Sequence, residues 1–183
     1  MSQNRFVMPP GAISSARRRA SKMVKNYEDG LDNASLAFSS HGAEHNIDLQ
    51  TKAKLAEVTF AMWAGENPKT AVHWADGADN GFDVKTGCQY VDVKHTSLRG
   101  QYLIWPVRKR DIFHSKPFNS LVLVKSDNDI YYVWCWLPKD EFFQKKLVAG
   151  SNHLLTTGTW FVHEKDCRKM DSFPRQEMNF GKV

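Results

Sequence analysis

The sequence predicts an α+β or mixed α/β domain, with helices first and then a mixed, mostly antiparallel central sheet flanked by helices. The main observation is a change in hydrophobic spacing, from a helical period before residue 65 to the alternating pattern of strands after Phe82. The chain has 183 residues, of which 42% are hydrophobic and 25% charged, so it is long and apolar enough to bury a core. These properties exclude a disordered chain.

Two helices are expected before the sheet, and they define the expected domain organisation. Residues 12–27 contain few helix breakers and predict a basic helix, whereas residues 33–46 are rich in Ser, Gly, His and Asn and predict a loop. A stronger helix is expected from Asp48 to about Ala64. We therefore expect an N-terminal helical basic arm over residues 1–47 and a main domain over residues 48–183.

Six segments with strand-like composition follow, and turn residues separate them. The triplet Asp127-Asn128-Asp129 predicts that two of them form a hairpin. Pro138 leads into a short helix at Lys139–Lys146, and a helical piece that runs through Met170 follows the last strand. The expected strands are Phe82–Lys85, Tyr90–His95, Tyr102–Val107, Ser120–Lys125, Ile130–Leu137 and Thr159–Val162.

Positive charge is concentrated in two regions of the chain. Residues 1–27 carry six basic side chains and no acidic one, although the net charge of the whole chain is only +5. The second cluster is offset only by Asp111 and comprises Lys94, Arg99, Arg108, Lys109, Arg110 and Lys116. Such clusters favour polyanions such as nucleic acid, because each neutralised phosphate releases condensed counterions. The alternative is a solvated, solubilising surface.

Cysteine use and hydropathy predict a reduced, cytoplasmic protein. The three cysteines, Cys88, Cys135 and Cys167, are an odd number without CxxC spacing, so no disulfide framework is expected. Uncharged runs fall far short of the ~20 apolar residues of a membrane span, and residues 1–10 lack the apolar core of a secretory signal. No Walker loop or dinucleotide fingerprint is present, so we expect no membrane partner and no organic cofactor.

A group of acidic residues is the strongest candidate for a chemical site. We expect Thr86-Gly87 to form a tight turn, which places Asp83 opposite Tyr90. Because side chains alternate along a strand, both of these residues then share a face with Asp92 and Lys94. Diagonal neighbours on such a face lie ~7–8 Å apart, which is close enough for two carboxylates to share a cation. The opposite, core-facing side is expected to carry Phe82, Val84, Val91 and Val93.

Glu57 supplies a third acid from the preceding helix. It lies on a stripe of apolar neighbours, where a lone carboxylate is costly. A metal ion or a lysine shared with other groups would offset that cost, whereas a helix cap or an arginine pair is the structural alternative. The stripe comprises Ala53, Ala56, Phe60, Trp63 and Ala64.

These residues, in this order, resemble the PD-(D/E)XK nuclease superfamily. The resemblance covers roughly residues 50–137 and rests on helical Glu57, on Gly-Phe-Asp83 and on Tyr-Val-Asp92-Val-Lys94, with a third strand at Tyr102–Val107. The segment from Val133 to Pro138 and the helix after it resemble the end of small phage and bacterial members. Phe82 departs from the pattern, because the motif that names the family has proline at this place.

The resemblance implies a restriction-endonuclease-like core and a metal-dependent DNA endonuclease. Asp83, Asp92 and the Val93 carbonyl would bind Mg²⁺, with Mn²⁺ as a substitute. Lys94 would position or activate the attacking water and stabilise the transition state. Glu57 would complete a second metal position or orient a bound water. The expected catalytic set is therefore Glu57, Asp83, Asp92 and Lys94.

DNA is the expected partner, in the cytoplasm of a bacterial or phage-infected cell. The phosphate contacts are expected from the basic arm and from the segment after the Asp-x-Lys strand, namely Arg17, Arg18, Arg19, Lys22, Lys25, Thr96, Arg99 and Gln101. Trp134 and Trp136 are expected to share one strand face, which suits either sheet packing or a dimer contact, so a homodimer is left open.

Three alternatives are kept. Asp83-Val84-Lys85 also fits an Asp-x-Lys motif with Asp76 or Asp79 upstream, although Asp92 and Lys94 would then be unexplained charges in mid-sheet. The chain would otherwise be a non-catalytic nucleic-acid-binding protein on the same fold, or a phage structural or interaction protein whose acids form a buried ion-pair network.

Overall fold

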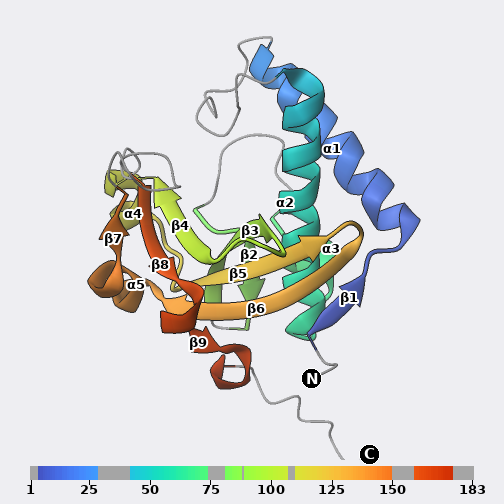
Figure 1. Cartoon of the computed structure of the whole chain (residues 1–183). Helices are drawn as coiled ribbons and strands as arrows, with labels where there is room; N and C mark the ends of the chain where they lie inside the picture. The colour runs from blue at the N-terminus through green and yellow to red at the C-terminus, as the bar shows by residue number, and fades with distance from the viewer. Residues whose placement is uncertain are drawn as a thin grey trace, which may run out of the picture.

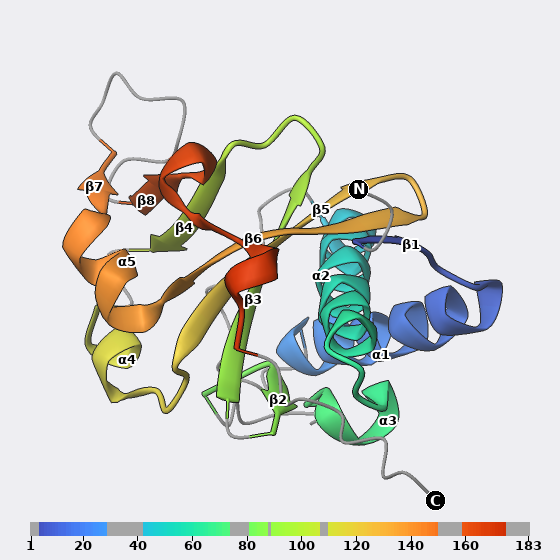
Figure 2. The same ribbon diagram turned by 90° about the horizontal axis from the view of Figure 1, so that it is seen from below.

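The structure is a computed structural model that describes residues 4–28, 42–73, 81–87, 89–106, 110–149 and 159–174. It confirms the α+β class: a curled mixed sheet is flanked by two long helices on one side and by a small second sheet with short helices on the other (Figure 1). Figure 2 views the same arrangement from below, with the two long helices again to the right of the sheet.

The helices are α1 (Pro10–Glu28), α2 (Ala43–Trp63), α3 (Pro68–Ala71), α4 (Arg110–Ser115) and α5 (Lys139–Lys145), with 3₁₀ turns η2 (Glu164–Asp166) and η3 (Met170–Ser172). The strands are β1 (Arg5–Val7), β2 (Val84–Thr86), β3 (Gln89–Ser97), β4 (Tyr102–Pro106), β5 (Ser120–Asp127), β6 (Ile130–Pro138), β7 (Leu147–Val148), β8 (Thr159–His163) and β9 (Arg168–Lys169).

The main sheet has the order β1-β6-β5-β3-β2, and β9 also pairs with β6. β3 and β5 are parallel, whereas the other described pairs are antiparallel. A parallel pair needs a crossover connection, and the segment between these two strands contains β4 and α4. The second sheet has the order β4-β8-β7. β3 is therefore a central strand, with the β2 hairpin on one side and β5 on the other.

Each face of the main sheet is covered by its own hydrophobic cluster. Along β5, Val122 and Val124 pack with α2 in the first hydrophobic cluster. Leu121 and Leu123 pack with β4, β8, α4 and α5 in the second hydrophobic cluster. This follows from strand geometry, because successive side chains point to opposite faces. β5 reads as a continuous apolar run because both of its faces are covered.

Helix α2 carries the apolar stripe predicted for it. Ala56, Phe60 and Trp63 are buried in the first cluster, and Glu57 is buried among them. The helix begins at Ala43, five residues earlier than predicted, and ends at Trp63. Gly65 follows with φ 80°, the left-handed conformation that commonly ends a helix at glycine.

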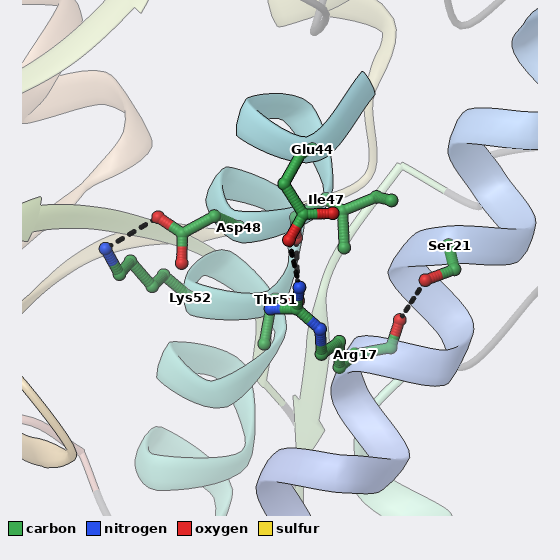
Figure 3. A network of polar contacts seen from close by, with 7 residues as sticks. All are labelled: Arg17, Ser21, Glu44, Ile47, Asp48, Thr51 and Lys52. Atoms are coloured by element: carbon green, nitrogen blue, oxygen red, sulfur yellow. Dashed lines mark hydrogen bonds and ion pairs between the residues drawn. The ribbon is translucent and has the colours of Figure 1, made fainter. Parts of the chain in front are cut away.

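The N-terminal segment packs against the body of the fold. β1 pairs with β6, and α1 buries Ala16, Ala20 and Val24 alongside α2. In Figure 3, Arg17 on α1 forms an ion pair with Glu44 on α2. The helical part of the predicted arm is thus confirmed, and its apolar face belongs to the core, whereas the boundary at residue 47 stays a prediction.

All six predicted strands are present, and their ends differ from the predicted ones by no more than two residues. The predicted α5 helix and the β5–β6 hairpin are confirmed, with Asn128 at φ 51° in the turn. The sequence analysis missed β1, α3, α4, β7 and β9. Most of these have only two to four residues, so tertiary pairing rather than local pattern defines them.

The prediction that Trp134 and Trp136 share a strand face is wrong. The register of β6 against β5 shifts between Leu123 and Val124, which is the mark of a β-bulge. Trp136 is consequently buried in the first cluster, whereas Trp134 is 43% exposed and stacks on the Lys125 ammonium at 4.3 Å. None of the helices in the described part of the chain has the length and apolar character that crossing a bilayer requires.

Candidate active site

The β2–β3 hairpin positions the predicted acids. Val84 pairs with Val91 and Thr86 with Gln89, so the turn begins after Thr86 and is not formed by Thr86-Gly87 as predicted. Gly87 has φ 49°, which fits the first position of a two-residue hairpin turn. The register differs from the expected one by two residues. A shift of two leaves every strand side chain on its predicted face.

Asp83 lies immediately before β2, at the edge of β3. Its backbone N–H donates to the Val91 carbonyl (2.9 Å), and its Oδ2 accepts a hydrogen bond from the Val93 N–H (2.7 Å). The carboxylate thus takes the place that a strand neighbour would have along β3. The N–H and C=O of one strand residue point the same way, so the Val93 carbonyl is directed toward Asp83.

Phe82 does not belong to the core-facing set, and that prediction is wrong. Its ring packs on Tyr90, with 4.6 Å between ring centroids, as part of the second cluster. The alternation fails because β2 begins only at Val84, so Phe82 has no strand geometry to direct it. Val84, Val91 and Val93 lie in the first cluster as predicted.

Asp92 and Lys94 lie on the face of β3 toward β4, opposite the face that carries Val91 and Val93. Asp92 is 3% exposed and forms an ion pair with the Lys94 ammonium. The Asp92 Oδ1 atom is buried and has no hydrogen-bond partner of normal geometry among the described residues. The Lys94 Nζ also lies 4.5 Å from the centroid of the buried Trp105 ring, a cation–π contact that holds the ammonium beside Asp92.

Glu57 reaches the same region from α2. It is buried and forms an ion pair with Lys54, which also donates a hydrogen bond to the His73 carbonyl (3.0 Å). The His73 N–H donates in turn to the Asp83 carbonyl (2.8 Å). His73 therefore connects the Lys54–Glu57 pair on α2 to the backbone of Asp83.

The charges of Glu57, Asp83 and Asp92 act on one another, which indicates that the three acids share one region of the protein. Burial and the neighbouring Asp92 charge raise the pKa of Asp83 to about 6, against the opposing effects of Lys94 and the Val93 N–H. Burial and the charges of Asp83 and Asp92 raise the pKa of Glu57 well above its ordinary value, against the opposing effect of Lys54. The three carboxylates thus repel one another in a low-dielectric site.

The donor set fits a hard cation bound by few protein ligands. No three His, Cys, Asp or Glu side chains within the described ranges lie close enough together to enclose a metal ion. Mg²⁺ does not require such a cage, because it is usually held by one or two carboxylates, with water and substrate oxygens as the remaining ligands. Asp83, Asp92 and the Val93 carbonyl offer that kind of set.

The alternative Asp-x-Lys motif has a different environment. Lys85 is exposed, and its Nζ lies 5.7 Å from the centroid of the Tyr90 ring. Asp76 and Asp79, the upstream acids of that motif, lie outside the described residues. The charges that act most strongly on Asp83 are those of Asp92 and Lys94.

The predicted phosphate-contacting residues lie in two separate places. Arg17, Arg18, Arg19, Lys22 and Lys25 are all on α1, which packs on α2 on the side away from β3 (Figure 1). Arg17 is paired with Glu44 there. Thr96 continues the Asp92–Lys94 face of β3, and Arg99 and Gln101 are exposed after the end of that strand.

Two lysines near the site were not among the predicted site residues. Lys54 lies one helical turn before Glu57, a spacing that could have indicated the pair. Lys116 precedes Pro117, which packs against the backbone of Gly81. The Lys116 Nζ lies 5.8 Å from the centroid of the Trp105 ring. Only the tertiary fold brings Lys116 to the same ring as Lys94.

The arrangement combines two carboxylates that can hold a hard cation, Asp83 and Asp92, with the nearby buried carboxylate of Glu57 and two ammonium groups that can neutralise a phosphate. Such a centre can bind a phosphodiester and direct a water molecule onto it. Comparisons with protein-family models, with curated proteins and with solved structures found no match for this chain.

Proposed function

We propose that this protein is a metal-dependent DNA endonuclease that hydrolyses phosphodiester bonds. The observation that carries the proposal is the charge of the buried centre. Glu57, Asp83 and Asp92 bring three carboxylates together, whereas Lys54 and Lys94 bring only two compensating charges. A buried excess of negative charge is costly unless a cation binds.

Each residue of the centre has a role in this chemistry. Asp83, Asp92 and the Val93 carbonyl would hold Mg²⁺ or Mn²⁺, which supplies Lewis-acid polarisation of the phosphate and a more acidic bound water. Lys94, fixed between Asp92 and the Trp105 ring, would direct its ammonium at the attacking water and at the charged phosphate oxygens. Glu57 would orient a bound water or complete a second metal position.

The order of elements supports a restriction-endonuclease-like core. An acid on α2 precedes an acid before β2, and the Asp-x-Lys pair follows on β3, which pairs with both β2 and β5. The elements that carry these residues pack on one another, because Val84, Val91 and Val93 bury against α2. The sequence motif and the packing therefore agree on one centre.

DNA is the proposed substrate, and the cytoplasm the proposed location. Phosphate contacts position a duplex without reading its sequence. Arg18, Lys22 and Lys25 are exposed on α1, and Arg99 and Gln101 are exposed beyond β3. These side chains would hold the DNA backbone on either side of the centre.

Cleavage assays with the purified chain test this function. Supercoiled, linear, single-stranded and branched DNA would be incubated with Mg²⁺, Mn²⁺ or EDTA. We expect metal-dependent cleavage that Asp92→Asn and Lys94→Ala reduce by at least 100-fold, while Lys85→Ala, an exposed lysine of the same hairpin, leaves it unchanged. Activity lost in Lys85→Ala and kept in Lys94→Ala would move the site to the alternative motif.

Two other outcomes would overturn the proposal. DNA binding without cleavage under any metal condition would indicate a non-catalytic nucleic-acid-binding protein. Neither binding nor cleavage would indicate a structural or interaction protein whose acids form an ion-pair network.

A further inference from the structure

Lys54 is a built part of the centre, and the inference drawn from it rests on the proposed function. Its side chain is 18% exposed, and that of its partner Glu57 is 9% exposed. The Glu57 carboxylate and the His73 carbonyl both hold the ammonium. A lysine held in this way, with little access to water, differs from a surface pair on the same helix such as Lys52 with Asp48, which lie 2.7 Å apart.

Each side of the centre has its own lysine. On the α2 side, the Lys54 ammonium pairs with Glu57, and its charge also acts on Asp83, although less strongly than that of Lys94. On the β3 side, the buried Asp92 Oδ1 has its ion pair with Lys94 but no hydrogen bond of normal geometry among the described residues. The Val93 carbonyl is directed to this same edge. Glu57 is thus the acid that Lys54 holds, whereas Asp83, Asp92 and the Val93 carbonyl are the ligands proposed for the metal ion.

The net charge of the five groups limits the number of metal ions. Three carboxylates and two ammonium groups leave one negative charge when all are ionised. One divalent cation changes this to a single positive charge, which suits a phosphate anion. A second divalent cation beside Lys54 would leave three positive charges in a buried site, and uncompensated buried charge is strongly unfavourable.

We propose that Lys54 takes the place of a second metal ion, so that the centre binds one divalent cation per chain and Glu57 is not a metal ligand. Glu57 is then a positioning residue, which holds the Lys54 ammonium between α2 and Asp83. Lys54 supplies the positive charge that a second metal ion would otherwise bring to the substrate phosphate.

Counting bound Mn²⁺ on the full chain tests this inference without DNA. Isothermal titration calorimetry, together with the loss of the electron paramagnetic resonance signal of free Mn²⁺, gives the stoichiometry and affinity of binding. Three variants would be compared with the wild type: Lys54→Met, the double variant Lys54→Met/Glu57→Gln, and Lys52→Met. The double variant keeps the net charge of the centre, and replacing both partners of a buried ion pair is usually tolerated. Lys52→Met removes a lysine of the same helix that pairs at the surface.

We expect one Mn²⁺ per chain in the wild type, in Lys52→Met and in the double variant, with affinities within about threefold of each other. Lys54→Met is expected to bind two, because it frees Glu57 as a ligand. Two ions on the wild type, a single ion on folded Lys54→Met, or a loss of more than tenfold in affinity in the double variant would each overturn the inference while leaving the endonuclease proposal in place. If Lys54→Met does not fold, the inference is judged on the Mn²⁺ stoichiometry of the wild type and on the Mn²⁺ affinity of the double variant. No Mn²⁺ on the wild type would overturn the proposed metal centre itself.

Discussion

Replacing Asp83 with asparagine should stabilise the metal-free protein while abolishing its proposed activity. In the unfolded chain Asp83 has its ordinary pKa of 3.8, whereas the folded protein raises this pKa to about 6. Between these values the folded state keeps a proton that the unfolded state has lost, so the free energy of unfolding falls as the pH rises. The cost is absent below pH 4 and complete above pH 6.

The magnitude follows from the size of the shift. One pKa unit corresponds to 1.36 kcal/mol, so the cost of ionised Asp83 above pH 6 reaches about 3 kcal/mol. Asparagine removes the charge, and its amide oxygen can still accept the Val93 N–H. We expect Asp83→Asn to gain about 1–3 kcal/mol at pH 8 in EDTA, which raises the melting temperature of a chain this long by roughly 2–12 °C.

Urea and thermal unfolding at pH 4, 6 and 8 provide the assay. Asp48→Asn is the control, because Asp48 pairs with Lys52 at the surface and should change stability by no more than about 0.5 kcal/mol at any of these pH values. Mg²⁺ at 100 times its dissociation constant should stabilise the wild type by about 2.7 kcal/mol and Asp83→Asn much less. A gain equal at pH 4 and pH 8, or no gain at pH 8, would show that ionised Asp83 does not destabilise the fold.

Two further predictions concern the exposed bases of α1 and the histidine that follows Lys94 on β3. If α1 binds DNA, replacing its exposed bases with glutamine should flatten the plot of log affinity against log salt by about 0.9 for each duplex phosphate that is no longer neutralised; an unchanged slope would remove α1 from the interface. The bases to replace are Arg18, Lys22 and Lys25. Burial lowers the pKa of His95 from 6.5 to about 4, so the unfolded state binds the proton first and stability falls as the pH drops through this range. His95→Asn should make that fall shallower in urea unfolding from pH 7 to 4, and an equally steep fall would assign it to other groups.

Substitution is a better test of α1 than deletion, for a reason that charge alone does not reveal. Residues 1–27 contain no acid and suggest a detachable arm. The structure instead buries Ala16, Ala20 and Val24 against α2. Deleting α1 would expose that core face, so a loss of DNA binding could then reflect a loss of folding. Changing the exposed bases leaves the buried face intact.

The faces of the β2–β3 hairpin could be predicted, although its turn could not. Side-chain direction depends only on whether a residue is odd or even along a strand, so a register error of two residues still placed Asp92 and Lys94 opposite Val91 and Val93. The position of the turn depends on the backbone conformation near Gly87, and the sequence there is compatible with several registers of the hairpin. The prediction for Phe82 was wrong for a different reason: alternation applies only inside a strand, and β2 starts later than predicted.

Features created by distant parts of the chain were beyond sequence reasoning. The bulge that separates the faces of Trp134 and Trp136 comes from the pairing of β6 with β5, and neither strand has a glycine to indicate it. The placement of Lys94 on Trp105 requires β4 to fold over β3. Lys54 is the exception, since its pairing with Glu57 follows from helical spacing alone.

The acids of the centre are held in place by contacts that do not depend on their charge. Asp83 is fixed by its backbone bond to Val91, and the backbone of Asp92 lies in a strand that is paired on both sides. Glu57 occupies a helix whose neighbours bury against the sheet. Asp83→Asn should therefore keep the fold and relieve repulsion, whereas neutralising Asp92 or Glu57 alone also breaks an ion pair with Lys94 or Lys54. A fold that gains stability when Asp83 is neutralised does not need that charge for structure, and a bound cation is the partner that would make the charge favourable.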